Sequence, residues 1–438
     1  MHRESGRKLI RRRKSVPEVL SIWENDSDGR IKEKPVIMRF LMHGYGFLIR
    51  VLLYGKVKEL QLNTKIRDRL FAAIRKGMDI EVPSIELSAE ECTEIMQIGE
   101  HQSIQLIIYR GIRLMNLSED CLKQFERSML KNAYKYIMRN EELNSISKAL
   151  DNDGIPYIPL KGAVLKQLYP EPEMRTSSDI DVLVREKDLD NAVKAVETTT
   201  DFKFESRNYH DVQMRAPGTV LELHFSIKEN MANIDKLLSR AWDYAKPAGS
   251  GSVYVFTPEF LVFHVIAHMS YHMVHGGLGI RPFLDLWLLR NKTEFDEEKV
   301  RKMCEECGIL TFYEKSCRLV DAWMDGKAIP EELASFEEYC LNGGVFGSAE
   351  SVNASRMRNQ QKGGYVLKRL LVSREVLEEE YPVLKEKKYL LPVYQMNRWM
   401  RLLDSEKRSN ALKELEGIRD VNQETVDSFD EMLRGLGL

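Results

Sequence analysis

The chain has 438 residues, of which 43% are hydrophobic and 30% are charged, and its formal net charge is −2. Since this length exceeds a single ordinary hydrophobic core, we expect a globular protein of two or three structural units. A charge so close to zero excludes a general electrostatic attraction to nucleic acid, so a polynucleotide partner would need a local basic patch.

The first segment of the chain is basic and polar. Its positive charge lies in Arg7–Lys8 and Arg11–Lys14, and no apolar core follows, so we expect no signal peptide. Residues 1–35 are therefore predicted to be a disordered tail. The alternative is that these charges attract RNA or an anionic surface.

The next segment, Val36–Tyr54, is rich in Met, Phe, Leu and Ile. Arg39, His43 and Arg50 interrupt it, so we expect an amphipathic core helix rather than a membrane span, with a membrane-surface helix as the alternative. The six cysteines are scattered through a large chain, which is typical of a reducing compartment. These features predict a cytoplasmic protein without a membrane span.

Helix signals continue to about residue 150. The stretch Ser88–Glu91 has a capping-box pattern, with Ser as the N-cap and Glu three residues later. A second helical pattern runs toward Leu150, and the turn-forming stretch Asp151–Gly154 ends it. Residues 36–150 are thus predicted to form an N-terminal helical region.

The most informative segment is Asp179–Val184, which alternates carboxylates with β-branched or apolar residues. In a strand, Asp179 and Asp181 point to the same face with their Cα atoms roughly 6.5 Å apart, while the apolar residues hold the other face in a core. Two carboxylates at this separation can hold one or two divalent ions, an arrangement that suits phosphoryl or nucleotidyl transfer.

The residues before this strand suit phosphate binding. Gly154–Leu160 predicts a short apolar strand, and Lys161 and Gly162 follow at a strand-to-helix turn, where the backbone can approach an anion closely. Arg175 adds a guanidinium fork that matches phosphate oxygens, and Ser178 adds a hydroxyl on the same loop. A compact α/β unit over residues 151–230 would contain all of these groups.

A third carboxylate lies downstream. Val220–Phe225 alternates apolar and polar residues as a half-buried strand does, with Glu222 and His224 on its polar face. If this strand pairs beside the Asp179 strand, Glu222 joins the same cluster. Two interpretations of His224 stay open: it acts as a base or contacts the acceptor, or it orients a carboxylate.

Residues 231–438 return to helical periodicity. Within them, Arg281 and Asp285 are four residues apart on a predicted helix, where we expect an exposed or interface ion pair. Cys304 and Cys307 lie in a helical stretch without a second Cys-x-x-Cys pair, so we expect helical cysteines rather than a zinc site.

Four of the nine histidines form a stripe at helical spacing. Three interpretations of the stripe stay open: core histidines at a helix–helix interface, residues that line the catalytic cleft, or metal ligands. The four are His264, His268, His272 and His275.

Taken together, these motifs resemble a bacterial family of uncharacterised nucleotidyltransferases within the DNA polymerase beta-like superfamily. The likeness is judged to extend over most of the chain after about residue 36, and it includes segments near Gly343–Gly347 and Tyr381–Leu384. The motifs that carry it are Pro159–Gly162, Tyr169–Pro170, Arg175, Asp179–Val184 and Glu222–His224.

The resemblance implies an α+β fold, with a small polymerase beta-like mixed-sheet core between N- and C-terminal helical regions. It implies transfer of a nucleoside monophosphate from an NTP to an acceptor hydroxyl with Mg²⁺ or Mn²⁺. Asp179, Asp181 and Glu222 would be the catalytic metal ligands. The expected substrate-binding residues are Lys161, Gly162, Arg175, Ser178 and His224.

Two departures from the superfamily pattern leave an alternative function open. Ala163 follows Gly162 where the superfamily usually has Ser or Gly, and the third carboxylate is Glu222 rather than the commoner Asp. The alternative is a catalytically degenerate nucleotide-binding sensor or scaffold protein. The sequence names neither the NTP nor the acceptor, which could be a small molecule, a protein or RNA, and it leaves the oligomeric state open.

Overall fold

The computed structural model describes residues 63–83, 85–115, 119–249, 251–343, 347–358 and 421–438, together with most of 371–400. All of them belong to one structural unit, Gln61–Leu438. The predicted tail (residues 1–35) and the predicted helix Val36–Tyr54 lie outside the described residues.

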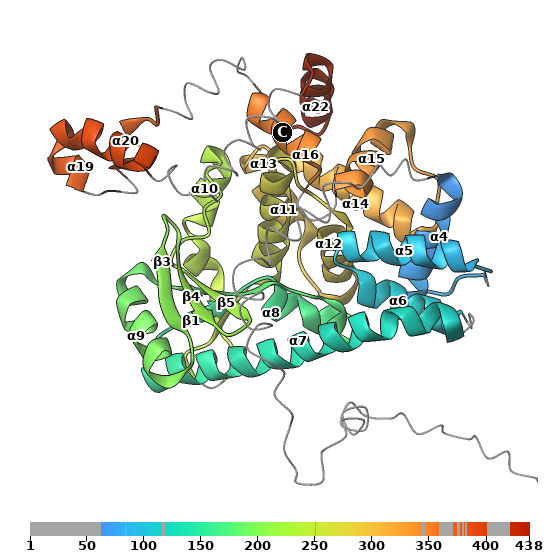
Figure 1. Cartoon of the computed structure of the whole chain (residues 1–438), viewed down its shortest axis with the longest axis horizontal. Helices are drawn as coiled ribbons and strands as arrows, with labels where there is room; N and C mark the ends of the chain where they lie inside the picture. The colour runs from blue at the N-terminus through green and yellow to red at the C-terminus, as the bar shows by residue number, and fades with distance from the viewer. Residues whose placement is uncertain are drawn as a thin grey trace, which may run out of the picture. The chain divides into compact units, whose positions relative to one another are not determined.

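The fold contains a five-stranded mixed sheet with the strand order β1-β2-β5-β4-β3, which lies beside α7 and α9 (Figure 1). The β2–β5 pair is parallel, and the other three pairs are antiparallel. A mixed sheet among many helices agrees with the predicted α+β class. The strands are β1 (Tyr157–Pro159), β2 (Asp179–Val184), β3 (Lys203–Arg207), β4 (Asp211–Ala216) and β5 (Thr219–His224).

One face of this sheet is apolar. Ile180, Val182 and Val184 of β2 are buried in a hydrophobic cluster together with residues of β4 and β5. The helices α7 (Glu119–Asn152) and α9 (Leu189–Thr199) supply the apolar side chains that cover this face. The alternation of β2 therefore leaves its aspartates on the opposite face, as the sequence pattern predicts.

The helices before the sheet follow their sequence signals closely. The predicted capping box is confirmed, because Ser88 Oγ accepts from Glu91 N at 3.2 Å and Glu91 Oε2 accepts from Ser88 N at 2.9 Å. The end of α7 at Asn152 agrees with the predicted break. The other three helices of this region are α4 (Thr64–Gly77), α5 (Ala89–His101) and α6 (Gln105–Leu114).

The region after the sheet is mainly helical, as predicted, with one short hairpin that the periodicity did not reveal, β6 (Ala245–Pro247) and β7 (Tyr254–Phe256). The longer helices are α10 (Ala232–Leu238), α11 (Pro258–Val274), α12 (Ile280–Lys292), α13 (Glu297–Glu306), α14 (Leu310–Asp325), α15 (Ala334–Gly343), α16 (Ala349–Met357), α20 (Leu391–Met400) and α22 (Gln423–Gly435). A single turn, α19 (Val383–Glu386), precedes α20.

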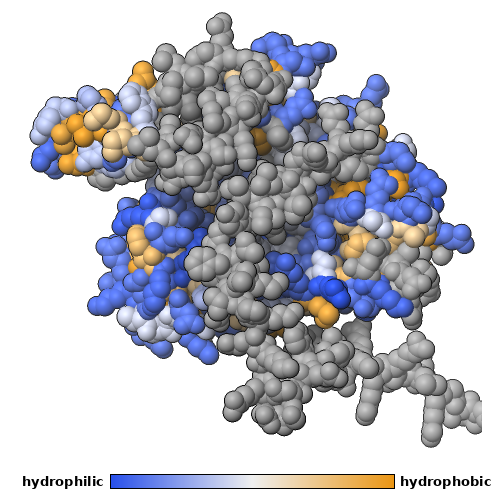
Figure 2. Space-filling model, in the orientation of Figure 1, coloured by the Kyte–Doolittle hydropathy of each residue, from blue (hydrophilic) through white to orange (hydrophobic). Residues whose placement is uncertain are grey.

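The described surface is largely hydrophilic, with an apolar area on the α19–α20 segment (Figure 2). Tyr389, Val393 and Met396 are the exposed apolar side chains there. No helix in the described part of the chain is long and apolar enough to cross a membrane.

Cys304 and Cys307 are free, buried thiols at the end of α13, which confirms their helical interpretation. Burial raises the pKa of the Cys307 thiol to about 11, so it stays protonated and unreactive at neutral pH. The other described cysteines, Cys92, Cys317 and Cys340, are also buried.

Two glycines let the backbones of α4 and α6 pack closely. A Cβ at Gly111 would lie 1.9 Å from the carbonyl oxygen of Ala73, and a Cβ at Gly77 would lie 2.2 Å from that of Ile107. Both obstacles are backbone atoms, which cannot move without separating the helices.

We expect Gly111→Ala to lower the free energy of unfolding by at least about 1–3 kcal/mol, because it overpacks this contact. Gly435→Ala is the control, since a Cβ there meets no atom within 4 Å. Chemical denaturation of both variants tests the contact. Equal stability of the two variants would contradict it.

Candidate active site

The carboxylates of the two polar strand faces meet because β2 and β5 are parallel neighbours. Their register places Asp181 beside Glu222 and Leu183 beside His224. The two strands thus meet the condition under which Glu222 joins the cluster, and Asp179, Asp181 and Glu222 share the face opposite the α7–α9 core. Since side chains alternate, His224 lies on that same face.

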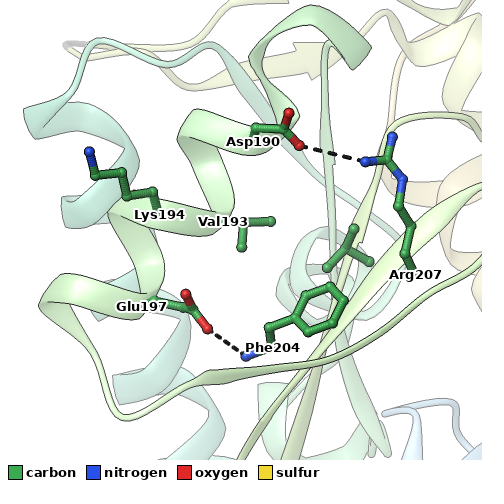
Figure 3. Close-up of a pocket in the computed structure, with 7 residues that line it drawn as sticks. Asp190, Val193, Lys194, Glu197, Phe204 and Arg207 are labelled. Atoms are coloured by element: carbon green, nitrogen blue, oxygen red, sulfur yellow. Dashed lines mark hydrogen bonds and ion pairs between the residues drawn. The ribbon is translucent and has the colours of Figure 1, made fainter.

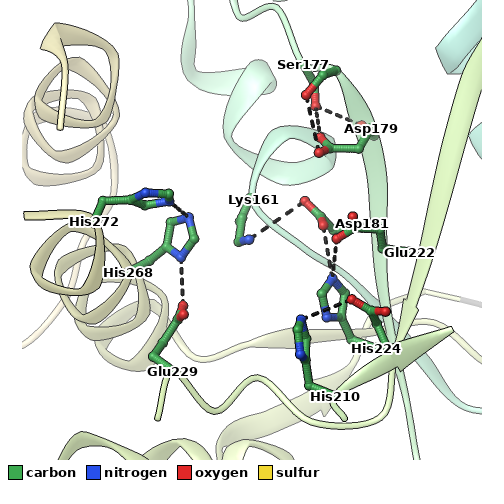
Figure 4. Close-up of polar contacts among 12 residues, drawn as sticks. Lys161, Ser177, Asp179, Asp181, His210, Glu222, His224, Glu229, His268 and His272 are labelled. Carbon is green, nitrogen blue, oxygen red and sulfur yellow. Dashed lines mark hydrogen bonds and ion pairs between the residues drawn. The ribbon is translucent and has the colours of Figure 1, made fainter. Parts of the chain in front are cut away.

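Asp181 is the most enclosed member of this cluster, with a side chain that is 8% exposed. One of its oxygens lies 3.0 Å from His224 Nε2, and the other lies 4.0 Å from Lys161 Nζ. His224 Nε2 is also 3.4 Å from Glu222 Oε2, while Gln213 of β4 donates to Glu222 Oε1 at 3.2 Å. Figure 4 shows Asp181, Glu222 and His224 converging from β2 and β5, with Lys161 facing Asp181.

Asp179 sits at the start of β2 and is held by the loop before it. Ser177 Oγ donates to Asp179 Oδ1 at 2.9 Å, and Ser178 Oγ lies 3.3 Å from Asp179 Oδ2. Burial and the nearby Asp181 charge nevertheless raise the pKa of Asp179. Any cation that joins the cluster therefore stabilises the ionised form of Asp179.

Two cations already compensate part of the negative charge. Burial alone would raise the pKa of Asp181, but Lys161 and His224 outweigh it and hold that pKa well below its ordinary range. Burial would lower the pKa of His224, but its contacts with Asp181 and Glu222 raise it to about 9. His224 is therefore an imidazolium at neutral pH in the metal-free protein.

The residues present fit a divalent cation. Ligand atoms of Asp181, Glu222 and His224 all lie within 4.8 Å of one another, and Asp179 lies two residues before Asp181 on the same face of the strand. Carboxylate oxygens are the ligands that Mg²⁺ and Mn²⁺ prefer.

The Lys161–Gly162 turn differs from the expected anion-binding helix start. The helix after it, α8 (Gly162–Leu165), is a single turn, so it offers little dipole for a phosphate. The unusual backbone angle belongs to Lys161, with φ 40°, rather than to Gly162. A Cβ at Gly162 would lie 2.8 Å from Arg175 Nη1, so a larger residue there would require that side chain to shift.

Lys161 has a strained backbone, and its ammonium lies 4.0 Å from Asp181 in the cluster. A non-glycine residue with positive φ is costly and is retained where the surroundings hold it. Burial would lower the pKa of Lys161, but the carboxylates around it, led by Asp181 and Glu229, raise it. Lys161 is thus a fully charged cation between the strand carboxylates and α11 (Figure 4).

Arg175 has a buried partner that sequence reasoning missed. Its Nε and Nη2 atoms bind the two oxygens of Asp285 at 2.9 and 2.8 Å, and Tyr169 Oη donates to Asp285 Oδ1 at 2.7 Å. The Arg175 guanidinium, which we expected to bind phosphate, is therefore already bound to Asp285 inside the protein. The expected Arg281–Asp285 pair was wrong, because Asp285 is 3% exposed and faces the Arg175 loop, while Arg281 donates to the Thr176 carbonyl at 3.0 Å.

Two of the three interpretations of the histidine stripe apply to different members of it, the core interpretation and the cleft-lining one. His264 is a core residue, 2% exposed and packed edge-on against Phe256. His268 Nδ1 contacts Glu229 Oε1 at 2.7 Å, and its Nε2 contacts His272 Nε2 at 2.9 Å. Burial and then the Lys161 charge lower the pKa of His268. Figure 4 shows His268 across Lys161 from the carboxylates, so it borders the same space.

The fourth histidine, His275, is exposed and contacts the Tyr271 carbonyl at 2.8 Å. Among the described residues, no cluster of three potential ligands that could hold one metal ion includes a stripe histidine.

An open hollow of about 290 Å³ lies elsewhere, between α9 and strands β3 and β4 (Figure 3). It is lined by Val193, Phe204 and Val212, and Val212 belongs to the apolar face that α7 and α9 cover. The hollow therefore lies across the sheet from the carboxylates and takes no part in their site.

The sequence from residue 88 to residue 325 matches the model of a family described as uncharacterised nucleotidyltransferases. The chain belongs to this family. No curated protein and no solved structure matches the sequence. The family match is narrower than the resemblance judged from motifs, since Gly343–Gly347 and Tyr381–Leu384 lie beyond it. As a nucleotidyltransferase, the protein is an enzyme that transfers phosphorus-containing groups, and the match contains the whole sheet.

The structure brings together Asp179, Asp181, Glu222, His224 and Lys161, which sequence reasoning had named. It adds three positioning groups that were not named as site residues. Ser177 beside the named Ser178 could have been found from the loop composition, whereas Gln213 and Glu229 become neighbours only through the strand register and the packing of α11. These three are bonded to Asp179, Glu222 and His268 respectively.

We expect Asp285→Asn to lower the free energy of unfolding by about 3–5 kcal/mol, because it leaves the Arg175 charge buried without a counter-ion. Asp190→Asn is the matched control, since its ion pair with Arg207 is exposed and worth less than about 1 kcal/mol. Thermal and urea denaturation measure both losses. Losses of equal size would show that the buried pair contributes no more than the surface one.

The raised pKa of His224 gives a second prediction, on EDTA-treated protein. Because the folded pKa of about 9 exceeds the ordinary value of 6.5, this group stabilises the fold fully below about pH 6.5 and loses that contribution as pH rises toward 9. Asp181→Asn should move the imidazole titration, followed by NMR, down toward 6.5. An unchanged titration would rule out Asp181 as the cause.

Proposed function

We propose that this protein is a metal-dependent nucleotidyltransferase, which moves a nucleoside monophosphate from an NTP to an acceptor hydroxyl. The main observation in support of this proposal is the register of β2 and β5, which places Asp181 beside Glu222, with Asp179 on the same face. Mg²⁺ or Mn²⁺ would be held by these three carboxylates. A bound ion would neutralise the triphosphate and the attacking oxygen, which is the chief requirement of this reaction.

The bonds that change are few. The acceptor oxygen attacks the α-phosphorus, the bond from that phosphorus to the bridging oxygen breaks, and pyrophosphate leaves with the electron pair. The acceptor proton passes to a nearby base, for which Glu222 is the candidate on the same strand face as His224. The acceptor class (small molecule, protein or RNA) and the NTP base stay open.

Lys161 is the proposed contact for the β- and γ-phosphates. Its Nζ atom lies 4.0 Å from Asp181 and forms no bidentate pair of the kind that Arg175 forms with Asp285. Gly162 keeps the turn narrow, and Ser178 offers a hydroxyl at the start of β2. Arg175 contributes through Nη1, since its other two nitrogens bind Asp285. His224 would meet the substrate or orient Asp181.

We further propose that residues 151–230 form a polymerase beta-like core, between helical regions at 36–150 and 231–438, in a cytoplasmic bacterial protein. The mixed sheet with its carboxylate pair on one strand and a third carboxylate on a parallel neighbour supports this assignment.

One observation favours a second candidate function, a nucleotide-binding sensor or scaffold without turnover. His224 Nε2 lies 3.0 Å from Asp181 and 3.4 Å from Glu222, in the space between the two carboxylates. A protonated imidazole there competes with a divalent ion for the same oxygens.

The test is transfer of label from each α-labelled NTP with Mg²⁺ or Mn²⁺, with purified protein alone and with cell extract. We expect labelled product from the wild type and a loss of at least about 100-fold in Asp181→Asn, because the charge that positions the ion is removed. Asp190→Asn, which lies across the sheet, is the control and should keep full activity.

The result also separates the two candidate functions. Metal-dependent NTP binding without transfer, in folded protein and with every nucleotide, would favour the sensor. Equal transfer by wild type and Asp181→Asn would contradict the proposed site.

A further inference from the structure

A second cluster of potential ligands shares His224 with the carboxylate cluster. It contains His210, Asp211 and His224, each of which offers one ligand atom within 4.8 Å of the others. Asp211 opens β4 and faces His224, the last residue of β5, in the strand register. The cluster is therefore built at the meeting edge of two neighbouring strands.

The imidazole of His224 has one satisfied nitrogen and one unsatisfied nitrogen. Nε2 is occupied by Asp181 and Glu222, whereas Nδ1 is buried and has no hydrogen-bond partner. The residue is only 5% exposed. Unpaired nitrogens at such depth are rare, and an absent ligand is one of the established reasons for them.

The other two residues of the cluster contact each other, and the His210 ring stacks beside that of His224 with their centroids 5.5 Å apart. His210 Nε2 lies 3.0 Å from Asp211 Oδ2, and the Nδ1 of His210 is also without a partner. Asp211 is 2% exposed, and its other oxygen accepts from Asn208 Nδ2 at 2.6 Å. His210 and His224 lie side by side in Figure 4, next to the carboxylate cluster.

The backbone fixes this arrangement. Phe225 N and Ser226 N both donate to the His210 carbonyl, at 2.9 and 3.2 Å, and Asn208 N donates to the Asp211 carbonyl at 2.8 Å. The segment before β4 is thereby tied to the end of β5, so the ligands need little ordering to bind an ion. Such preorganisation is what a metal site requires.

We propose that His210, Asp211 and His224 bind a first-row transition-metal ion, of which Zn²⁺ is the leading candidate. Two imidazoles and one carboxylate form a donor set typical of Zn²⁺ and Fe²⁺ rather than Mg²⁺, and three protein ligands leave a position open. The hydrogen bond from His224 Nε2 to Asp181 supplies the carboxylate that a metal-bound histidine ordinarily has behind it.

This site has a consequence for the carboxylate cluster. An ion on Nδ1 fixes the tautomer of His224, so that its Nε2–H points at Asp181 and Glu222. The transition-metal ion is thus a positioning element for the cluster and is distinct from the divalent ion proposed for Asp179, Asp181 and Glu222. The inference does not depend on nucleotidyl transfer.

The experiment uses untagged full-length protein that is stripped with EDTA and titrated with Co²⁺, whose visible absorption reports nitrogen and oxygen ligands. We expect one equivalent to bind with a visible band, and His210→Gln to weaken binding by more than roughly 100-fold, since even outer partners of metal ligands are worth 10–100-fold. His210 is only half-buried, so this variant should fold. Asp211→Asn should have the same effect on binding.

Asp179→Asn is the matched control, because it weakens the carboxylate cluster without touching His210 or Asp211. The Co²⁺ band should persist in it. A band lost in Asp179→Asn but kept in His210→Gln would overturn the proposal, as would the absence of any band in the wild type. Zn²⁺ should also raise the melting temperature of the wild type and Asp179→Asn, but not that of His210→Gln.

Discussion

The parallel pairing of β2 with β5 is the constraint on which the rest of the site depends. A shift of one residue in this register would move Glu222 to the apolar face and replace it with Leu221 or Leu223. The register is held because both strands bury β-branched and leucine side chains against α7 and α9. Packing on one face of the sheet thus sets the chemistry on the other.

Charge balance explains how so many carboxylates remain together in the metal-free protein. Lys161 and His224 sit against Asp181, so the excess negative charge is partly compensated. A divalent ion that binds to the cluster has to compete with both of these cations for the carboxylate oxygens. The Arg175–Asp285 pair lies nearby, and it anchors to α12 the loop that precedes β2.

Local patterns were sufficient for much of this organisation. The strand Asp179–Val184, the capping box at Ser88–Glu91 and the long helix that ends at Asn152 all depend on neighbours in sequence. The third carboxylate could also be predicted, because the alternation around Glu222 indicates a strand whose polar face is available. Only the pairing partner had to be supplied by the structure.

The remaining groups depend on contacts that are distant in sequence. Asp285 is 110 residues from Arg175, so a helix pattern that joins it to Arg281 carries no sign of its real partner. Glu229 and His268 are 39 residues apart and meet only when α11 packs near the sheet. The lack of a hydrogen-bond partner for His224 Nδ1 likewise follows from burial, which the residue type does not reveal.

The most direct test of the central claim is electron paramagnetic resonance of Mn²⁺ bound together with a non-hydrolysable NTP analogue. The three-carboxylate site predicts a bound Mn²⁺ signal in the wild type that largely disappears in Glu222→Gln, although that residue lies on a different strand from Asp179 and Asp181. An unchanged Mn²⁺ signal in Glu222→Gln would contradict the account, because the ion would then not depend on the pairing of β2 with β5.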